Sequence, residues 1–398
     1  MDDAQNPKLS STNQKELTCP TCAGNLVFVP GSNRMRCEQC GHELEIEDSP
    51  IEIEELDFED YIAHNQGGME TQTLHTVRCN SCGAHVSFDE HITSDRCPFC
   101  SSVIVVTDTI SETQIKPGLL LPFRLTPSEA TARFGLWLKG LWFAPSKLKK
   151  LAEPQAIKGI YIPYWTFDAH TTTHYRGRRG DHYVTTITVP VTRNGRTTME
   201  PRTVTQTRWR NASGVVTVDF DDVLVLASKS VPQKLANQLE PWDLPQAVPY
   251  NEMYLSGHRT ETYQIDLPQG FELAKQRMEP AINAAIRRDI GGDQQVITSK
   301  GTEHSDITFK HTLLPIYISS FRYKSKVYQF LINARTGRVQ GQRPYSAAKI
   351  ALAVLLAIAL AWLVWRVYIR TQVDSPRNGY EYSPYFDDTD WRGYSSDT

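Results

Sequence analysis

Residues 19–40 read CPTCAGNLVFVPGSNRMRCEQC, and residues 79–100 read CNSCGAHVSFDEHITSDRCPFC. Both stretches contain two Cys-x-x-Cys pairs separated by fourteen residues, so the chain carries one cysteine pattern twice, sixty residues apart. Each copy also has an alternating apolar run after its first pair: Leu26 and Phe28 in one copy, Val86 and Phe88 in the other. The repeat predicts two small modules, each built from two tight turns joined by short β-strands.

All eight cysteines of the chain belong to these two copies. A tetrahedral zinc site takes four thiolates at roughly 2.3 Å, and one Cys-x-x-Cys turn offers two of them from a single knuckle. We therefore predict two zinc ribbons that hold one zinc ion each. The predicted metal ligands are Cys19, Cys22, Cys37 and Cys40 in the first ribbon and Cys79, Cys82, Cys97 and Cys100 in the second.

Iron, a redox dithiol and disulfides are the alternatives to zinc. Sites with four cysteines also suit iron. A redox Cys-x-x-Cys usually stands alone near a βαβ pattern. Disulfides need an oxidising compartment. The start of the chain is polar and lacks the features of a secretory signal, so it does not indicate such a compartment. Because bound metal stabilises a module with little core of its own, replacing Cys97 and Cys100 by Ser is expected to unfold the second ribbon only.

The formal net charge of −3 conceals three differently charged regions. Residues 1–110 hold 19 acids and 6 bases, residues 111–370 hold 20 acids and 34 bases, and residues 371–398 hold 6 acids and 2 bases. Ten of the eighteen residues at 43–60 are Asp or Glu, and such blocks are usually solvated, although the apolar residues among them could dock. We expect a disordered N-terminus at 1–16, the first ribbon at 17–43, an acidic linker at 44–75 and the second ribbon at 76–107.

Residues 115–345 are expected to form a basic body of mixed α+β structure. Helical spacing marks residues 128–151 and 270–290. Alternation and β-branched residues predict strands at 118–125, 159–170, 183–191, 203–210 and 215–226, and a three-stranded meander at 308–339. The body also shows signs of duplication, because GIYIPYW at 159–165 follows the first helix and LPIYISSF at 314–321 follows the second.

Residues 350–369 read IALAVLLAIALAWLVWRVYI, twenty residues with one charge. A helix of this length spans roughly 30 Å of hydrocarbon, and a soluble helix seldom lacks a polar face over five turns. We therefore predict one transmembrane helix at 349–370, with Trp362, Trp365 and Tyr368 suited to the membrane interface. The polar, acidic tail at 371–398 is expected to be disordered.

The body contains no catalytic motif. The phosphate loop GxxxxGK[ST], the metalloprotease motif HExxH and the nucleophile motif GxSxG are all missing from the sequence. His170 and His174 lie in a Thr-rich run that predicts a polar strand surface rather than a metal site. Arg176, Arg178 and Arg179 stand beside two glycines and predict a basic loop, either solvated or in contact with phosphate or lipid headgroups.

The paired ribbons resemble the TFIIB-type zinc-ribbon proteins of bacteria, in residues 77–83 (VRCNSCG) and 95–100 (DRCPFC). The resemblance extends through 56–61 (LDFEDY) and 158–165 (KGIYIPYW) to the C-terminal helix. The chain looks like a member of a family often labelled as relatives of the primosomal replication helicase. That label rests on the ribbon cysteines. The motor motifs of the helicase are missing from this sequence. The resemblance implies a membrane protein, in some members encoded near stomatin-like scaffold proteins, and no catalytic residues.

These features favour a non-catalytic, membrane-anchored adaptor whose ribbons bind protein partners. The alternative is a zinc-ribbon protein that binds nucleic acid in replication or transcription, which would need a cationic face that the acidic ribbon region lacks. The expected location is the bacterial inner membrane, with a single helix, the bulk of the chain in the cytoplasm and the short C-terminal tail outside. The expected partners are the membrane, with contact to anionic lipid, and a protein such as a stomatin-like scaffold, with no small-molecule substrate.

Overall fold

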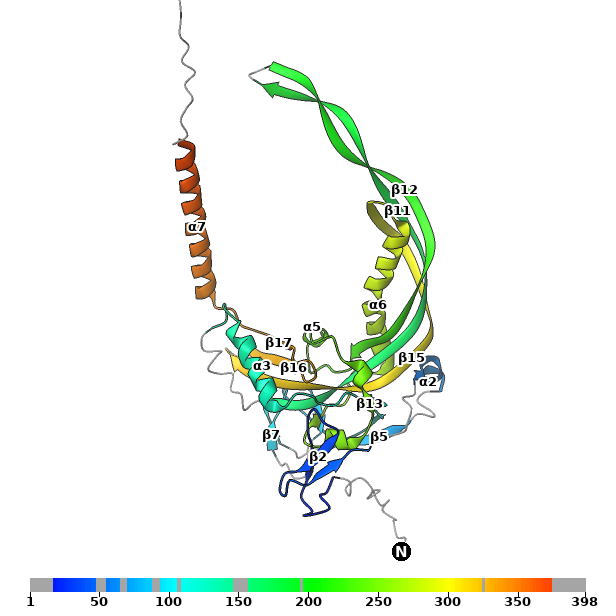
Figure 1. Ribbon diagram of the computed structural model, residues 1–398. Coiled ribbons are helices and arrows are strands. Elements are labelled where there is room, and N and C mark those ends of the chain that lie inside the picture. The colour runs from blue at the N-terminus through cyan, green and yellow to red at the C-terminus, as the bar shows by residue number, and fades with distance from the viewer. Residues whose placement is uncertain are drawn as a thin grey trace, which may run out of the picture. The chain divides into compact units, whose positions relative to one another are not determined.

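A computed structural model describes residues 17–47, 55–64, 70–87, 94–105, 109–145, 157–193, 196–323 and 326–373. It shows a mixed α+β protein, with two clusters of cysteines near the N-terminus and one long apolar helix near the C-terminus (Figure 1). This coarse architecture is confirmed. The predictions for residues 1–16, for residues 48–54 and 65–69 of the linker, and for the tail beyond residue 373 lie outside the described residues.

The cysteine repeat corresponds to two small β modules. The first module (residues 17–47) is an antiparallel sheet of β1 (Leu26–Phe28), β2 (Arg34–Cys37) and β3 (Glu43–Glu45). In the second module (residues 70–115), β5 (Thr71–Arg78) pairs with both β6 (His85–Ser87) and β9 (Thr109–Ile115), and β7 (Ser94–Arg96) pairs with β8 (Val103–Val105). Short strands connect the cysteine turns of both modules, as the repeat predicts.

Three very long strands form the centre of the body. They are β11 (Lys158–Arg193), β12 (Arg196–Leu226) and β15 (Gln294–Tyr323), in the order β12-β11-β15. The smaller strands of this sheet are β4 (Leu56–Asp57), β10 (Leu119–Leu120), β13 (Val248–Pro249), β14 (Arg259–Thr260), β16 (Lys326–Asn333) and β17 (Val339–Gly341). The helices of the body are α2 (Phe58–His64), α3 (Pro127–Lys139), α5 (Gln233–Asn237) and α6 (Leu267–Ile290), with 3-10 turns η2 (Leu244–Gln246) and η3 (Glu252–Leu255).

Alternate residues of β11 belong to two different hydrophobic clusters, because successive side chains of a strand point to opposite faces. Ile160 and Ile162 belong to a cluster that includes cysteines of the second module. Trp165 and Phe167 belong to a cluster that includes the apolar side of α6. The sheet therefore has the second module on one face and α6 on the other.

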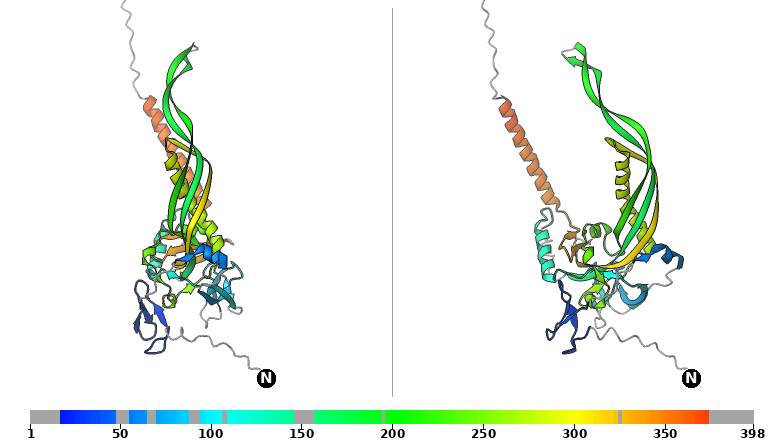
Figure 2. Two further views of the ribbon diagram at one scale, coloured as in Figure 1. Left: turned by 90° about the vertical axis from the view of Figure 1, so that its right-hand side faces the viewer. Right: turned by 45° about the vertical axis from the view of Figure 1, so that its right-hand side comes forward.

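The β11–β12 hairpin continues past the end of β15. The pairing of β11 with β15 stops at Gly180 and Gln294, whereas the pairing of β11 with β12 continues to Arg193 and Arg196. Figures 1 and 2 show α6 following the three-stranded part and the two-stranded part extending beyond it. We call this two-stranded part, residues 181–193 and 196–208, the hairpin arm.

Part of the acidic linker docks on the body. β4 pairs with β15, so that Leu56 lies opposite Phe309, and Glu55 forms an ion pair of 2.9 Å with Lys310. Tyr61 of α2 is buried and packs on Phe309, with 5.7 Å between ring centroids. The prediction of a solvated linker is therefore wrong for residues 55–64, because their apolar side chains find partners on the sheet despite the surrounding charge.

The predicted breaks between the body strands are also wrong. Residues 159–191 form one continuous strand, and residues 203–226 lie in another. The predicted basic loop lies inside β11, where Gly177 permits close contact: a Cβ on it would stand 2.6 Å from the Val296 oxygen. Gly180 plays the same part beside Trp209. These glycines mark tight packing against neighbours, not a turn.

The helix at 267–290 and the meander of β15, β16 and β17 agree with the predictions. The predicted helix at 128–151 is seen as α3, which stops at Gly140, and residues 146–150 lie outside the described part. The two apolar strands that suggested a duplication pair with each other in antiparallel register, Ile162 opposite Leu314. The predicted strand at 118–125 is reduced to the two residues of β10.

The apolar helix α7 (Ala347–Val373) forms, with Phe143–Pro145, a compact unit separate from the rest of the chain. Residues 347–370 are long and apolar enough to cross a membrane, with a mean hydropathy of 2.5, and none of the spanning window is buried. The helix extends three residues into the predicted tail.

Candidate metal centres

The same backbone turn occurs at all four Cys-x-x-Cys pairs. In each pair the amide of the first cysteine donates to the carbonyl five residues ahead, and the amide four residues ahead donates back to the first cysteine. These eight hydrogen bonds are 2.7–3.0 Å long and begin at Cys19, Cys37, Cys79 and Cys97. Four identical knuckles from unlike sequences show that the spacing of the thiols determines the turn.

Each knuckle needs a left-handed residue directly after its second cysteine. These residues are Ala23 (φ 57°), Gly41 (φ 75°), Gly83 (φ 77°) and Ser101 (φ 59°). The sequence marks only the two glycines, because L-residues rarely adopt this conformation. Gly24, which also follows a cysteine pair, has an ordinary φ and is needed for space, since a Cβ there would stand 3.1 Å from the Cys37 Sγ.

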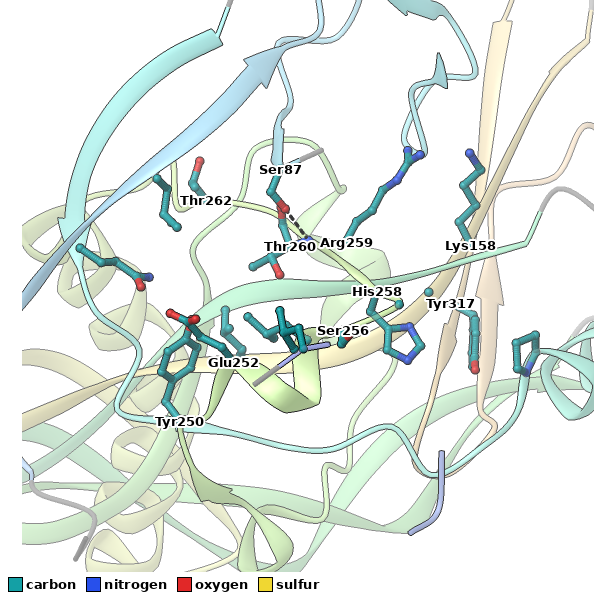
Figure 3. Close-up of a pocket in the computed structure, with 18 of the residues that line it drawn as sticks. Ser87, Lys158, Tyr250, Glu252, Ser256, His258, Arg259, Thr260, Thr262 and Tyr317 are labelled. Atoms are coloured by element: carbon teal, nitrogen blue, oxygen red, sulfur yellow. Dashed lines mark hydrogen bonds between the residues drawn. The ribbon is translucent and has the colours of Figure 1, made fainter. Parts of the chain in front are cut away.

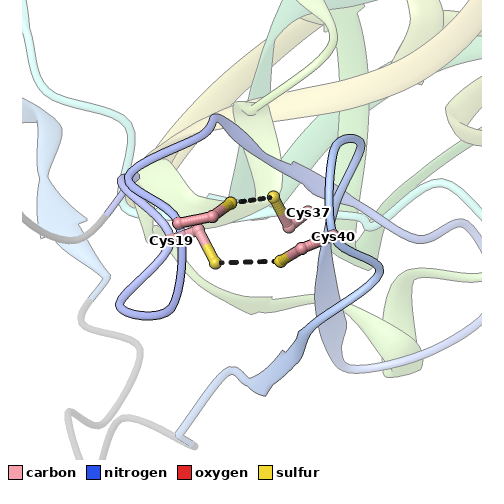
Figure 4. Close-up of side chains that lie close together, drawn as sticks. Cys19, Cys37 and Cys40 are labelled. Atoms are coloured by element: carbon pink, nitrogen blue, oxygen red, sulfur yellow. Dashed lines mark hydrogen bonds between the residues drawn. The ribbon is translucent and has the colours of Figure 1, made fainter.

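Each module brings its four sulfur atoms into one small cluster. In the first module Cys19 and Cys40 Sγ are 3.6 Å apart, and Cys22 and Cys37 Sγ are 3.4 Å apart (Figure 4). In the second module both corresponding distances, Cys79 to Cys100 and Cys82 to Cys97, are 3.6 Å. All ligand atoms of each cluster lie within 4.8 Å of one another, so each set of four predicted cysteines could hold a metal ion.

Hydrogen bonds within the knuckles and between the thiols lower the pKa of some of the cysteines. At Cys19, burial raises the pKa of the thiol, but hydrogen bonds from the amides of Thr21 and Cys22 outweigh it and lower the pKa to about 6. At Cys82, a hydrogen bond from the Cys97 thiol lowers the pKa to about 5. At Cys97, the hydrogen bond with the Cys82 thiol and burial raise the pKa instead, so the protons are shared unequally within a cluster before metal binds. A metal ligand must be the thiolate, so metal binding would release the remaining protons.

The second cluster is built into the core of the body, whereas the first is nearer to solvent. Cys79, Cys97 and Cys100 are buried, together with Phe99. Three polar contacts join the same region to β15, β16 and β11 of the sheet: Ser101 Oγ to the Ser320 carbonyl (2.8 Å), Gln329 Nε2 to the Phe99 carbonyl (2.8 Å) and Lys158 Nζ to Asp95 (2.8 Å). In the first module, Cys22 and Cys40 are exposed.

The first module joins the body through the segment around η3. Phe28 packs edge-on against Tyr254, with 5.1 Å between ring centroids. The Phe28 amide donates to the Ser256 carbonyl at 3.2 Å, and Ser256 Oγ donates to the Leu26 carbonyl. This module therefore joins the body through a few specific contacts, and its residues are not members of the two hydrophobic clusters described for the faces of the sheet.

A pocket of about 840 Å³ lies between the two modules and the body (Figure 3). Its cations are already paired, because Lys158 and Arg259 both contact Asp95. His258 stacks on Phe123, with 3.8 Å between ring centroids, and burial lowers its pKa to about 4. Among the described lining residues none hydrogen-bonds to the His258 ring, so the pocket shows no nucleophile–base pair.

A third cluster of possible metal ligands, made of acidic residues, was not predicted. Asp168, Asp221 and Asp222 bring carboxylate oxygens within 4.8 Å of one another at a β-bulge between β11 and β12. Lys310 Nζ lies 3.3 Å from Asp222 and 3.8 Å from Asp168, so a fixed cation already offsets part of the negative charge of the group. Only the register of the long strands brings these residues together, and no local motif could have shown it.

The two predicted strand histidines lie apart on β11. His170 Nδ1 is 2.5 Å from Asp219 Oδ1 and His174 is exposed, in agreement with a polar strand surface. Arg178 lies over the ring of Trp209, with 5.2 Å to the ring centroid, and Arg179 pairs with Asp181 at 2.8 Å. The basic residues of this region therefore lie along β11 and do not form a loop.

No family model matches the chain. The chain is similar to uncharacterized protein YdjG of Bacillus subtilis (strain 168), with 25% identity over 334 residues. The aligned region covers 84% of this chain and 91% of the relative. The likeness thus extends over most of both proteins, and the name of the relative assigns no activity.

Proposed function

We propose that the protein is a membrane-anchored adaptor whose two modules are zinc ribbons, each with one structural zinc ion, and that it binds protein partners without catalysis. The observation that carries the proposal is that both clusters are closed sites. Each has four thiols facing one centre. Catalytic zinc keeps one position for water or substrate, whereas structural zinc has four protein ligands.

The sulfur geometry supports zinc. Four ligands at roughly 2.3 Å from a tetrahedral ion are about 3.8 Å apart, and the closest sulfur pairs of the two clusters are at 3.4–3.6 Å. Iron would accept the same four thiolates, so the metal has to be identified by elemental analysis.

The first module is the better candidate for partner binding. Its residues are not members of the cluster that buries the second set of thiols, and two of its ligands are exposed. Arg34 and Arg36 both pair with Glu43, at 3.4 and 2.6 Å. This leaves the module without the cationic face that phosphate binding needs, and so favours a protein partner, such as the stomatin-like scaffold that the resemblance suggests.

The membrane anchor in this proposal is α7. Arg335, Arg338, Arg343 and Lys349 precede the hydrophobic stretch, while the residues beyond Arg370 are net acidic. By the positive-inside rule, the modules and the body face the cytoplasm of the inner membrane and the tail lies outside. This orientation also keeps the thiols in a reducing compartment.

Binding of nucleic acid is the second candidate, and the hairpin arm favours it. In the arm Arg208 lies over Tyr183, and at its base Arg178 lies over Trp209, at 5.0 and 5.2 Å from the ring centroids. Arginines interleaved with aromatic rings are common where single-stranded nucleic acid binds. On this alternative the arm, together with the zinc modules, would contact the backbone and bases.

One experiment separates the two candidates. Full-length protein in detergent, wild type or Cys22→Ser/Cys40→Ser, is used to capture partners from membrane extract and is tested for gel shifts with DNA and RNA. Ser32→Ala, which keeps all four thiols of the module, is the matched control. The adaptor predicts a defined protein that wild type and S32A retain and the double variant loses. Tight, zinc-dependent binding of nucleic acid that the double variant loses would contradict it.

A further inference from the structure

The turn after α3 presents two aromatic side chains to solvent. Leu141 and Ala144 are buried, with 4% and 1% of their surface exposed. Between them, Trp142 is 82% exposed and Phe143 is 44% exposed. A short turn fixed by its two ends thus displays a pair of large aromatic residues that the described residues of this protein do not cover.

This turn is attached to the start of α7. The Ser346 amide donates to the Phe143 carbonyl at 2.8 Å, and Lys349 Nζ donates to the Ala144 carbonyl at 2.8 Å. Ser346 directly precedes α7, and Lys349 lies in its first turn. Phe143 and its covalent neighbour Trp142 are therefore held beside the point where the candidate span begins.

The surrounding sequence has the charge of a membrane-facing segment. Residues 130–152 contain no acid and five bases, among them Lys147, Lys149 and Lys150. Trp is enriched at membrane–water interfaces, and anionic lipids attract nearby Lys and Arg by about 1 kcal/mol each. An aromatic pair followed by lysines suits the headgroup region of an anionic leaflet better than it suits bulk water.

We propose that Trp142 and Phe143 insert into the interfacial layer of the bilayer that α7 spans, as a second membrane contact of the protein. The inference rests on the proposed membrane anchor. The occupant is a lipid surface rather than a second protein, because the turn is hydrogen-bonded to the first residues of the span. The contact adds a second membrane-facing segment, residues 142–143, to the span that begins at residue 347.

The test uses the full chain in nanodiscs that contain anionic lipid, prepared with ordinary lipids or with lipids brominated near the headgroup end of their acyl chains. Bromine quenches tryptophan emission on contact. The contribution of Trp142 is obtained as the difference between wild type and Trp142→Phe, which keeps an aromatic ring. Trp137→Phe is the matched control, since Trp137 packs on Phe330, with 5.4 Å between ring centroids. Trp362→Phe/Trp365→Phe gives the contribution of α7.

The proposal expects the brominated lipid to quench the Trp142 contribution strongly and to leave the Trp137 contribution unchanged. If the α7 contribution is quenched and that of Trp142 is not, the interfacial contact is wrong while the anchor stands. A blue-shifted but unquenched Trp142 contribution would show that protein covers the turn and would also refute the proposal. If neither Trp142 nor α7 is quenched, α7 does not lie in the bilayer, and both the anchor and this inference fail.

Discussion

The eight cysteines have the same local geometry but different surroundings. Three thiols of the second set (79, 97 and 100) are buried and belong to a hydrophobic cluster of the body, with Cys82 exposed. In the first set two thiols (19 and 37) are buried and two (22 and 40) are exposed. The sequence treats the two sets as equivalent repeats. The two sets nevertheless pack differently, so loss of metal should have unequal consequences for the two modules.

We expect Cys97→Ser/Cys100→Ser and Cys22→Ser/Cys40→Ser each to lose one of two zinc ions. The first change should destabilise the whole body by more than about 4 kcal/mol, because it leaves unpaired thiols inside the main core. The second should leave the thermal unfolding of the body nearly unchanged. Elemental analysis and hydrogen exchange across β11 and β15 would check this. Equal, purely local unfolding in both variants would restore the expectation from the sequence.

His311 gives the stability a pH dependence. The ring is buried, its Nδ1 lies 2.8 Å from the Ile115 carbonyl, and burial lowers its pKa from 6.5 to about 4. Between these two values the unfolded chain binds more protons than the folded chain. The contribution of His311 is therefore complete above pH 6.5 and is lost as the pH falls toward 4.

Replacing His311 by Gln should remove about 2 kcal/mol of the loss of unfolding free energy between pH 7 and pH 5. Urea unfolding at the two pH values would measure this difference. His174→Gln, at an exposed position of β11, is the control and should keep the wild-type pH dependence. An unchanged pH dependence in H311Q would contradict the assignment.

At the residue level, the sequence identifies the eight thiols and little else of the sites. Cysteine spacing is a local property, so the clusters follow from it. The left-handed Ala23 and Ser101 could not be predicted, because the knuckle forces a conformation that their side chains do not favour. The pairing of Lys310 with Glu55 joins residues that are 255 positions apart and depends on the register of the sheet.

Among the elements, α6 shows most directly how the long sheet is covered. Its buried residues recur at helical spacing, and the Asp266 side chain caps its first turn by accepting from the Gln269 amide at 2.9 Å. Gly270 allows the helix to approach β11, since a Cβ at this position would stand 2.7 Å from Trp165 Cδ1. Trp165 is fully buried and has no room to move.

Gly270→Ala should therefore lower the free energy of unfolding by about 1–3 kcal/mol through overpacking. The matched control is Gly135→Ala in α3, where an added Cβ would meet nothing within 4 Å. This control should raise stability by up to about 1 kcal/mol, because Ala is the better helix former. Urea unfolding of both variants would test the contrast, and equal effects of the two substitutions would refute the packing argument.

Helices with clear periodicity were predictable, but the limits of the long strands were not. Gly177 and Gly180 suggested a loop because glycine is common in turns, yet both serve close packing inside β11. The acidic linker suggested solvation because of its charge, yet Tyr61 and Leu56 dock on β15. In each case a distant partner, invisible in the local sequence, reverses the local preference.

At the level of the whole molecule, if α7 is the proposed membrane anchor, its orientation determines which side of the membrane carries the two cysteine modules. A reporter fused to the C-terminus of the full-length protein should be active only if it is of a kind that works outside the cytoplasm. The reason is that the residues before the helix are basic and those after it are acidic. A reporter fused to the N-terminus should give the opposite result. Cytoplasmic activity of the C-terminal reporter would reverse the proposed topology.

The contacts of the second cluster also have a consequence for biosynthesis. Phe99 reaches Gln329 across 230 residues of chain, and Ser101 reaches Ser320 across 219. At roughly 5–20 residues per second, a ribosome needs tens of seconds between making these cysteines and making the strands that bury them. During that interval a nascent chain exposes thiols to oxidants and to competing metals.

On the proposed function, metal loading would therefore be coupled in time to translation for the second module and not for the first. Stalled nascent chains that end before β16 should lose zinc from the second cluster to a chelator quickly, while chains released after β16 should resist it. The first cluster should acquire its resistance as soon as residue 47 has left the ribosome. Pairing of the last strands of the sheet would then be the final step in burying the metal of the second cluster. This step would be completed just before α7 enters the membrane.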